Sequence, residues 1–365
     1  MGADGRQHSV YDRNKTECRK KLRARMCEVD TGAWIERRDI TAGQWLDEWL
    51  ATCCGQTRST TRRSYAGAIA RMKPVIGRVR LQDLDAARVR RLQSRLLDEG
   101  YAPSTVSNTV TILATALKVA RQARLIADVP TDDVPRPRQT KPEMHIIDRP
   151  QLPEFLAQCA RYRCGSALTA LLLTGLRIGE LRALRWSDVD LDAATLTVRR
   201  QLVKASSLPW HFADAKDGSN RTIVLTAAAV RLLRSQRAAQ AERRLAAGAN
   251  WQEDEFTADL VFRTSTGGFL RNSHLARTLH TIGERIGLPG LHIHDLRHSY
   301  AVAALRAGVD VKTVQHNLGH ASAAMTLDVY AAYTTDAGRT AAAKLDAWYR
   351  TQPSAPDTPV LLTLK

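Results

Sequence analysis

Long apolar segments are missing from the sequence. No run approaches the roughly 20 apolar residues that a membrane-spanning helix needs. The opening residues, MGADGRQHSVYDRNK, also lack the apolar centre of a secretory signal. These absences exclude an integral membrane protein and predict a cytoplasmic location with no membrane partner.

Cysteine is scarce, and its spacing excludes a zinc site. The six cysteines are Cys18, Cys27, Cys53, Cys54, Cys159 and Cys164. None forms a CxxC pair or lies near a suitably spaced histidine, and thiols of a cytoplasmic chain stay reduced. A P-loop and a carboxylate cluster are missing as well. We therefore expect no metal, no other cofactor and no cysteine nucleophile.

Acidic residues are too few to balance the basic ones. The chain has 54 lysines and arginines against 37 aspartates and glutamates, a formal net charge of +17, which predicts a polyanionic partner. Because 25% of the residues are charged and 44% are hydrophobic, the chain is not a disordered basic tail. Its 365 residues suffice for two domains and a smaller appendage.

The segment LHIHDLRHSYAVAALRAG, from Leu291, places polar groups in a helical apolar pattern. His294 and Arg297 are three positions apart, so on a helix both project from one face and can reach one small anion. Asp295 between them is interpreted as a helix-start residue. The pattern predicts a phosphate-binding helix.

A turn and a tyrosine follow this helix. Gly319 ends the apolar run VKTVQHNL, so His320 is expected on the turn beyond a helix end. Ser322 can cap the next segment, which carries Tyr330 ten positions after His320. An imidazole and a guanidinium with a phenol close by predict a phosphodiester held for attack. Tyr333 is the alternative nucleophile.

The pattern HxxR followed by GHxxxxxTLDxY resembles the tyrosine recombinase (phage integrase) family. The segment LTGLRIGELRALRWSDVDL resembles the one that carries the family's first catalytic arginine, here Arg177, and Lys216 with RTIVL resembles its lysine-bearing β-hairpin. Lys204 is the alternative lysine. The resemblance covers residues 148–350 well and 41–136 more loosely. It implies six catalytic residues, Arg177, Lys216, His294, Arg297, His320 and Tyr330.

Phosphodiester chemistry explains these residue types. Negative charge on the non-bridging oxygens grows during attack, and the permanently protonated Arg177 and Arg297 can neutralise it through paired hydrogen bonds. His320 can donate a further hydrogen bond. Arginines nearby favour the phenolate of the tyrosine, and His294 is placed to take the phenol proton. Lys216 is the candidate acid that protonates the leaving 5′ oxygen.

Residues near Arg177 receive supporting interpretations. Glu180 lies three positions after Arg177 and is interpreted as a partner that keeps the guanidinium aimed. Arg182 and Arg185 are expected to be surface residues or phosphate contacts. His298 is expected to be structural or to contact DNA.

Apolar periodicity predicts a mainly α-helical fold with a small antiparallel β-sheet. Residues 41–136, opened by a capping Thr41, form a helical bundle that resembles the family's core-binding (SAM-like) domain. A proline-rich stretch, DVPTDDVPRPRQTK, predicts an extended connection, with residues 137–147 as the linker. Residues 148–350 resemble the family's mixed α/β catalytic domain.

Strands and helix starts within that second domain can also be assigned. TLTVRRQLV, WHFADAK and RTIVL are predicted to form one three-stranded antiparallel sheet, and DLVFR a further strand. Asp148 is expected to cap the helix PQLPEFLAQCARY, and AGRTAAAKLDAWYR is expected to be the final helix. SALTALLLTG is predicted to be a buried helix, which Thr174 and Gly175 break so that Arg177 emerges at a turn.

Basic and hydroxyl side chains on the predicted bundle form a candidate DNA surface. Arginines recur on its helices, and hydroxyl and amide residues open the last helix, where backbone N–H groups commonly meet phosphates. Any single arginine could be an ordinary solvated one, but with the net charge the set predicts a DNA clamp. The set is Arg62, Arg63, Arg71, Arg88, Arg91, Arg95, Ser104, Thr105 and Asn108.

The two ends of the chain have weaker patterns. In residues 1–40, KLRARMC alternates basic and apolar residues before a turn at Asp30, which predicts a small basic β-hairpin that binds DNA arm sites or else a flexible basic lead. Residues 351–365 form a proline-rich C-terminal tail ending in VLLTL, which either docks on a neighbouring protomer or is disordered.

The resemblance implies a site-specific DNA recombinase (integrase) that cleaves and rejoins DNA through a 3′-phosphotyrosyl intermediate, for integration or excision of a mobile genetic element. Its implied partners are double-stranded DNA with attachment or core sites, a homotetramer on synapsed DNA, and accessory DNA-bending or directionality proteins in the nucleoid. The alternatives are a chromosome-dimer-resolving recombinase, a type IB topoisomerase-like enzyme, or an inactive DNA-binding accessory or regulatory protein.

Overall fold

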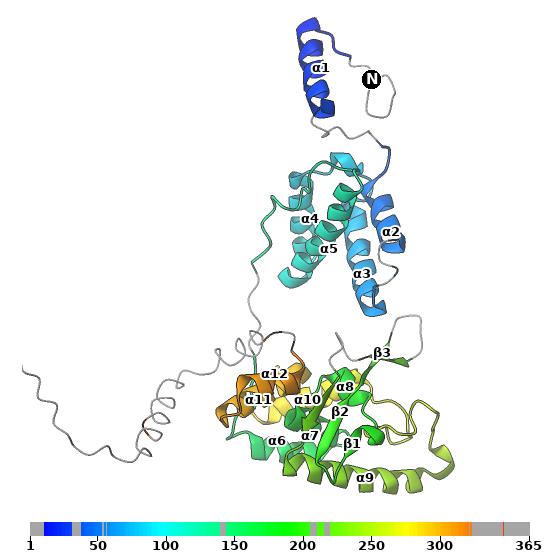
Figure 1. Ribbon diagram of the computed structural model, residues 1–365, viewed down its shortest axis with the longest axis vertical. Coiled ribbons are helices and arrows are strands. Elements are labelled where there is room, and N and C mark those ends of the chain that lie inside the picture. The colour runs from blue at the N-terminus through cyan, green and yellow to red at the C-terminus, as the bar shows by residue number, and fades with distance from the viewer. Residues whose placement is uncertain are drawn as a thin grey trace, which may run out of the picture. The chain divides into compact units, whose positions relative to one another are not determined.

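The computed structural model describes residues 11–30, 38–52, 55, 57–138, 144–204, 210–214, 220–320, 322 and 346. The chain splits into two compact units (Figure 1). The first combines Met1–Pro142 with Lys204–Pro209, and the second combines Glu143–Val203 with Trp210–Lys365. Both units are mainly helical and the sheets are small and antiparallel, which confirms the predicted fold class.

The first unit begins with helix α1 (Lys15–Asp30), where the sequence predicts a β-hairpin. The KLRARMC segment is helical, so the prediction is wrong for this segment, and residues 31–37 lie outside the described residues. Lysine, leucine, arginine, alanine and methionine are strong helix formers. Their preference outweighs a short alternation of basic and apolar residues.

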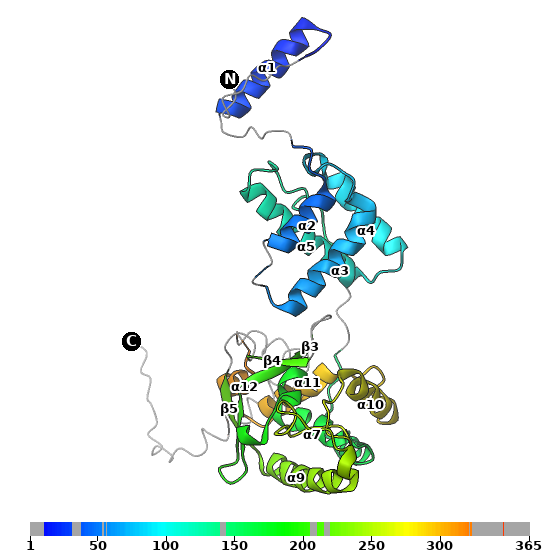
Figure 2. The ribbon, with the colours of Figure 1, turned by 90° about the vertical axis from the view of Figure 1, so that its right-hand side faces the viewer.

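The other described helices of this unit pack into a bundle (Figure 2), and their buried side chains form one hydrophobic core. They are α2 (Ala42–Thr52), α3 (Ser59–Ile76), α4 (Ala86–Asp98) and α5 (Pro103–Gln122), with a 3-10 turn, η1 (Leu81–Asp83).

Thr41 caps α2, as predicted. Thr41 Oγ1 accepts a hydrogen bond from the Gln44 N–H (3.2 Å), and the Gln44 side chain accepts one from the Thr41 N–H (2.9 Å). The apolar stripe of this helix puts Trp45, Leu46 and Trp49 into the core.

The chain that leaves the bundle packs against it further than its composition predicts. Val129 and Val134 are buried in the bundle core, and Arg136 donates hydrogen bonds to α5 at 2.8 and 3.1 Å. Residues 129–136 therefore belong to the bundle and not to an extended connection.

The second unit is built around the apolar helix α7 (Gly165–Thr174), which packs against α6 (Leu152–Ala160), α9 (Ala227–Ala247) and α11 (Ile293–Arg306). This confirms SALTALLLTG as a buried helix. The remaining elements are α8 (Ile178–Arg182), η2 (Trp186–Asp188), η4 (Gly248–Asn250), α10 (Asn272–Arg285) and α12 (Val311–Leu318).

Within the described part of the chain, five strands form two small sheets instead of the single sheet that the sequence predicts. One sheet has the order β1-β2-β5 and the other pairs β3 with β4. The segment TLTVRRQLV is divided at Arg199, because Arg199 and Arg200 both form ion pairs with the buried Asp188, at 3.3 and 2.5 Å. The strands are β1 (Val189–Asp190), β2 (Thr195–Val198), β3 (Arg200–Lys204), β4 (Trp210–Asp214) and β5 (Arg221–Val224).

Two local predictions in this unit are wrong. DLVFR forms no strand but two isolated bridges, Leu260 with Arg185 and Arg263 with Phe269. Asp148 does not cap α6. Its carboxylate pairs with Arg306 at 2.7 Å, and that hydrogen bond lowers the pKa of Asp148. A partner 158 positions along the chain cannot be read from local spacing.

Several predicted features lie outside the described residues. They are Lys216, Tyr330, the final helix predicted over 337–350 except Asp346, and the C-terminal tail 351–365. Among the helices that the structure describes, none is both long and apolar enough to cross a membrane.

We expect Trp45→Ala to destabilise the bundle by about 3–5 kcal/mol. The Trp45 side chain is buried, and its indole N–H donates to the Ala116 carbonyl at 3.1 Å. Trp45→Phe, which loses the hydrogen bond but retains a ring, should cost about 1–2 kcal/mol. Urea unfolding followed by circular dichroism measures both, and Leu97→Ala, at a 40% exposed position, is the control. Equal losses for Trp45→Ala and Leu97→Ala would contradict the assignment.

Candidate active site

Gly175 turns the chain so that Arg177 emerges between α7 and α8. Gly175 has φ 65°, and a Cβ there would lie 2.5 Å from Tyr300 Cδ1 and 2.9 Å from Leu318. Only glycine fits this left-handed, crowded position. The break predicted at Gly175 is confirmed, and Arg177 becomes the N-cap residue of α8.

Glu180 lies buried beneath Arg177. Its carboxylate accepts hydrogen bonds from the Arg177 side chain (2.8 Å) and backbone N–H (3.0 Å), and from Arg221 at 2.7 and 3.1 Å. Burial raises the pKa of Glu180, but the hydrogen bonds and charge of Arg221 and Arg177 outweigh it, so the pKa is lowered. An ionised, fully occupied carboxylate suits an orienting partner and not an acid or base.

Arg297 is tied to the same region from α11. Its side chain donates to the Gly175 carbonyl (2.7 Å) and to the Leu318 carbonyl (2.5 Å), while Arg177 donates to the adjacent Gly319 carbonyl (2.6 Å). Burial and the charge of Arg177 lower the pKa of Arg297 to about 9, which leaves it protonated at neutral pH. The two arginines from different helices therefore converge on one turn.

His320 follows that turn, as predicted. Gly319 ends α12 in the left-handed region with φ 62°, and the His320 N–H donates to the Gln315 carbonyl at 3.1 Å. Burial and the charges of Arg297 and Arg177 lower the pKa of His320 to about 4. Its imidazole is therefore neutral at pH 7 in the free chain.

His294 and His298 stand edge to face on α11, with ring centroids 4.5 Å apart. His294 is an exposed residue. Partial burial of its imidazole and the charge of Arg297 nevertheless lower the pKa of His294. Burial, His294 and Arg297 lower the pKa of His298 to about 4. A neutral His294 can accept a proton, as a general base must.

The predicted site residues thus fall into two groups. The structure brings Arg177, Glu180, Arg297 and His320 together, with His294 coupled to them through the charges of Arg177 and Arg297. Lys216 and Tyr330 lie outside the described residues, and Lys204 ends β3. Within the described ranges, no group of histidine, cysteine or acidic residues could hold a metal ion.

Two residues of the site carry no catalytic role in the sequence pattern. Arg221 contacts Glu180 across 41 positions, and the His298 ring lies edge to face against the His294 ring. The only indication in the sequence was that Arg221 and His298 both lie inside motif segments.

Arg182 is not the surface residue that the sequence predicts. It is 6% exposed, donates to the Leu270 carbonyl (2.6 Å) and stacks on Trp210 at 4.4 Å, while Arg185 stacks on Phe212.

The candidate DNA surface is spread over three helices of the first unit. Arg88 pairs with Asp85 (2.8 Å) and Arg95 pairs with Glu99 (2.7 Å). Arg71 donates to Thr109 of α5 at 3.2 Å, which places it near the predicted phosphate contacts Ser104, Thr105 and Asn108. The exposed arginines of the set are Arg62 and Arg63 on α3 and Arg91 and Arg95 on α4.

Comparisons with known proteins agree with this arrangement. Residues 145–336 match the phage integrase family model, and residues 41–97 match a phage integrase N-terminal SAM-like domain. A tyrosine recombinase XerC-like protein of Caldanaerobacter subterraneus subsp. tengcongensis is 25% identical over 342 residues, which are 88% of this chain and 86% of the relative.

Two solved structures share the fold. The Tn1549 transposon integrase in complex with a circular intermediate DNA superposes with a TM-score of 0.72 at 19% identity, covering 84% of this chain and 99% of that one. A lambda integrase tetramer bound to a Holliday junction gives 0.62 at 16% identity, covering 87% and 88%.

The lowered pKa of His298 predicts a pH-dependent stability. The pKa of His298 is about 4 in the folded chain against an ordinary value of 6.5. Between pH 4 and pH 6.5 the unfolded chain therefore binds more protons than the folded chain. Stability is therefore complete above pH 6.5 and falls as the pH approaches 4. His298→Gln should lessen this fall, as measured by urea midpoints at pH 7, 6 and 5. His280→Gln, whose side chain is 63% exposed, is the control; an unchanged slope in His298→Gln would contradict the prediction.

Proposed function

The chain belongs to the phage integrase family, and from this premise we propose that it is a site-specific DNA recombinase that cleaves and rejoins DNA through a 3′-phosphotyrosyl intermediate. One observation carries the proposal. The guanidinium groups of Arg177 and Arg297 are both hydrogen-bonded to the turn that leads into His320. Such a cluster can stabilise the charge of a phosphodiester under attack.

The arginines and His320 act on the non-bridging oxygens. Arg177, whose side chain is 26% exposed, can present its outer N–H groups to DNA. Arg297 is buried and adds its positive charge to the site. His320, neutral in the free chain, has one N–H to donate. A bound phosphate would raise its pKa, because a negative charge favours the protonated imidazole.

The nucleophile is the Tyr330 hydroxyl. As its oxygen bonds to phosphorus, its proton passes to His294, and the bond from phosphorus to the 5′ oxygen breaks. Lys216 gives that oxygen a proton, with Lys204 as the alternative acid. The phosphotyrosyl bond conserves the energy of the diester, so a 5′-hydroxyl of a second strand can reverse the step without ATP.

The first unit supplies the clamp on DNA. Residues 41–136 form the core-binding domain and residues 148–350 the catalytic domain. The candidate DNA surface supports this division, since exposed arginines lie on α3 and α4 and hydroxyl residues lie at the start of α5. These groups contact phosphates and position the duplex without reading its sequence.

The recombination is that of a mobile genetic element, carried out by a homotetramer on two synapsed DNA sites in the nucleoid, with accessory bending or directionality proteins. The transposon and phage integrases that share its fold support this assignment. Chromosome-dimer resolution stays the alternative. The clustering of the described catalytic groups favours an enzyme over an inactive accessory protein.

We expect Tyr330→Phe to abolish covalent attachment to DNA and to retain DNA binding, because only the nucleophilic oxygen is lost. The wild-type chain, incubated in EDTA with nicked duplexes of candidate attachment-site sequence, should give a covalent band after denaturing electrophoresis. Tyr333→Phe is the matched control and should keep the band. A band that persists in Tyr330→Phe but is absent in Tyr333→Phe would move the nucleophile to Tyr333.

Neutralising the exposed arginine Arg91 should weaken DNA binding equally on all sequences. Arg91→Gln should reduce the slope of log affinity against log salt by about 1, as the loss of one phosphate contact does. Fluorescence anisotropy with a random-sequence duplex between about 50 and 200 mM salt measures the slope. Arg121→Gln, an exposed arginine near the opposite end of α5, should leave it unchanged. Equal slopes for both variants would count against the clamp.

A further inference from the structure

Arg221, the first residue of β5, is a buried arginine to which the proposed chemistry assigns no role. Its side chain is 2% exposed, and its guanidinium donates to both oxygens of Glu180, at 2.7 and 3.1 Å. Its Nε donates to the Asn317 carbonyl at 2.7 Å. One guanidinium thus connects β5, α8 and the end of α12.

On one side, Arg221 binds the carboxylate of Glu180, which orients the Arg177 side chain. Glu180 Oε1 receives Arg177 and Arg221 at 2.8 and 3.1 Å, so the two guanidinium groups share one oxygen. Without Arg221, the buried Glu180 would have Arg177 as its one guanidinium partner among the described contacts, and both carboxylate oxygens would attract it. The Arg177 side chain would be drawn inward, away from DNA.

On the other side, Arg221 supports the turn that carries His320. A Cβ on Gly319 would lie 2.9 Å from Arg221 Nη1 and 3.1 Å from Cζ, so the backbone of this turn rests directly on the guanidinium. The Gly319 carbonyl also accepts the hydrogen bond from Arg177. The positions of Arg177 and His320 therefore depend on the same buried group.

Charge also argues that this cluster serves an anion. Arg177, Arg221 and Arg297 surround one carboxylate, Glu180, which leaves an excess of positive charge beside the turn. A purely structural arrangement would gain by replacing such charges with apolar side chains, since burying them is costly.

Resting on the proposed function, we infer that Arg221 is a positioning residue that holds the Arg177 guanidinium and the turn of His320 in one geometry for the scissile phosphate. It acts through Glu180 and the backbone of α12.

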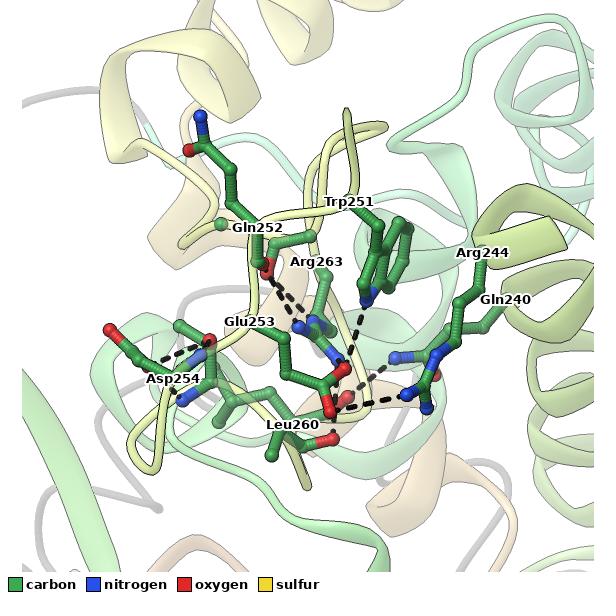
Figure 3. Close-up of polar contacts among 12 residues, drawn as sticks. Gln240, Arg244, Trp251, Gln252, Glu253, Asp254, Leu260 and Arg263 are labelled. Atoms are coloured by element: carbon green, nitrogen blue, oxygen red, sulfur yellow. Dashed lines mark hydrogen bonds and ion pairs between the residues drawn. The ribbon is translucent and has the colours of Figure 1, made fainter. Parts of the chain in front are cut away.

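Arg263 provides a matched control. It is buried to the same extent, with 2% of its side chain exposed, and pairs with Glu253 at 3.1 Å. Figure 3 shows it with Glu253 and Trp251, and its ring contact with Trp251 is 4.6 Å. Among the described residues, its side chain bonds to Gly267, Glu253, Ala258 and Gln252, none of which is catalytic. Arg221→Met and Arg263→Met therefore both remove a buried, ion-paired arginine. Of the two, Arg221→Met is the variant that removes a partner of Glu180, the residue that orients Arg177.

The experiment compares the rates of covalent complex formation at equal folded fraction, on suicide DNA whose cleavage position has been mapped with the wild-type chain. We expect Arg221→Met to be about 10²-fold slower than Arg263→Met, since a small misplacement of a catalytic group has a cost of this size. DNA affinity should be equal in the two variants. Equal rates would overturn the inference.

A second substrate separates positioning from general damage to the fold. A methylphosphonate at the scissile position replaces one charged oxygen by a methyl group, so the linkage is neutral and needs less help from Arg177. The deficit of Arg221→Met should shrink to below about tenfold on this DNA, as should that of Arg177→Ala. A deficit of unchanged size in Arg221→Met, with Arg177→Ala recovered, would show that Arg221 does not act through Arg177.

Arg221→Lys covers the case in which Arg221→Met does not fold. Lysine can reach Glu180 but cannot also make the forked contacts that join it to Asn317, so an intermediate loss of about tenfold is expected. A wild-type rate would overturn the inference. If the wild-type chain forms no covalent complex on any DNA, the proposed function fails, and that result is seen without any variant.

Discussion

The buried carboxylate of Glu180, shared by Arg177 and Arg221, is the contact on which the candidate site depends. Removing water from three charged groups is costly, and the cost is recovered only while every partner is in place. Loss of one partner leaves the others incompletely paired. This all-or-none character makes the cluster rigid, and it holds an arginine at the surface in one orientation before any substrate arrives.

Rigidity of this kind suits phosphoryl transfer to a tyrosine. The reaction needs no energy source, because one ester replaces another, so the protein contributes position and charge. Arginines in excess of nearby carboxylates supply the charge. Burial and the charges of these arginines lower the pKa values of His298 and His320 to about 4, so both imidazoles are neutral at pH 7 in the free chain. The free site therefore combines an excess of positive charge with neutral imidazoles, which suits the binding of an anion.

The features that depend on interactions between neighbouring residues could be predicted from the sequence. The Thr41 cap, the buried helix α7, the break at Gly175 and the helix end at Gly319 were all predicted correctly, because each depends on residues within about one helical turn. Errors arose where distant partners decide. The strands near Arg199 are separated by the ion pairs with Asp188, and Asp148 pairs with Arg306 instead of capping α6. The N-terminal segment is a different case, because the local helix preference of its residues outweighs the short alternation that predicts a hairpin.

By itself, the sequence determined the helical and strand-forming segments, the excess positive charge and the types of residue available for chemistry, since these follow from composition and spacing. Tertiary structure alone decided which of them meet. Arg177 and Gly319 are 142 positions apart, Arg297 and Gly175 are 122 apart, and Arg221 and Glu180 are 41 apart. Contacts over such separations exist only after the helices and strands have packed, because no local backbone preference extends that far along the chain.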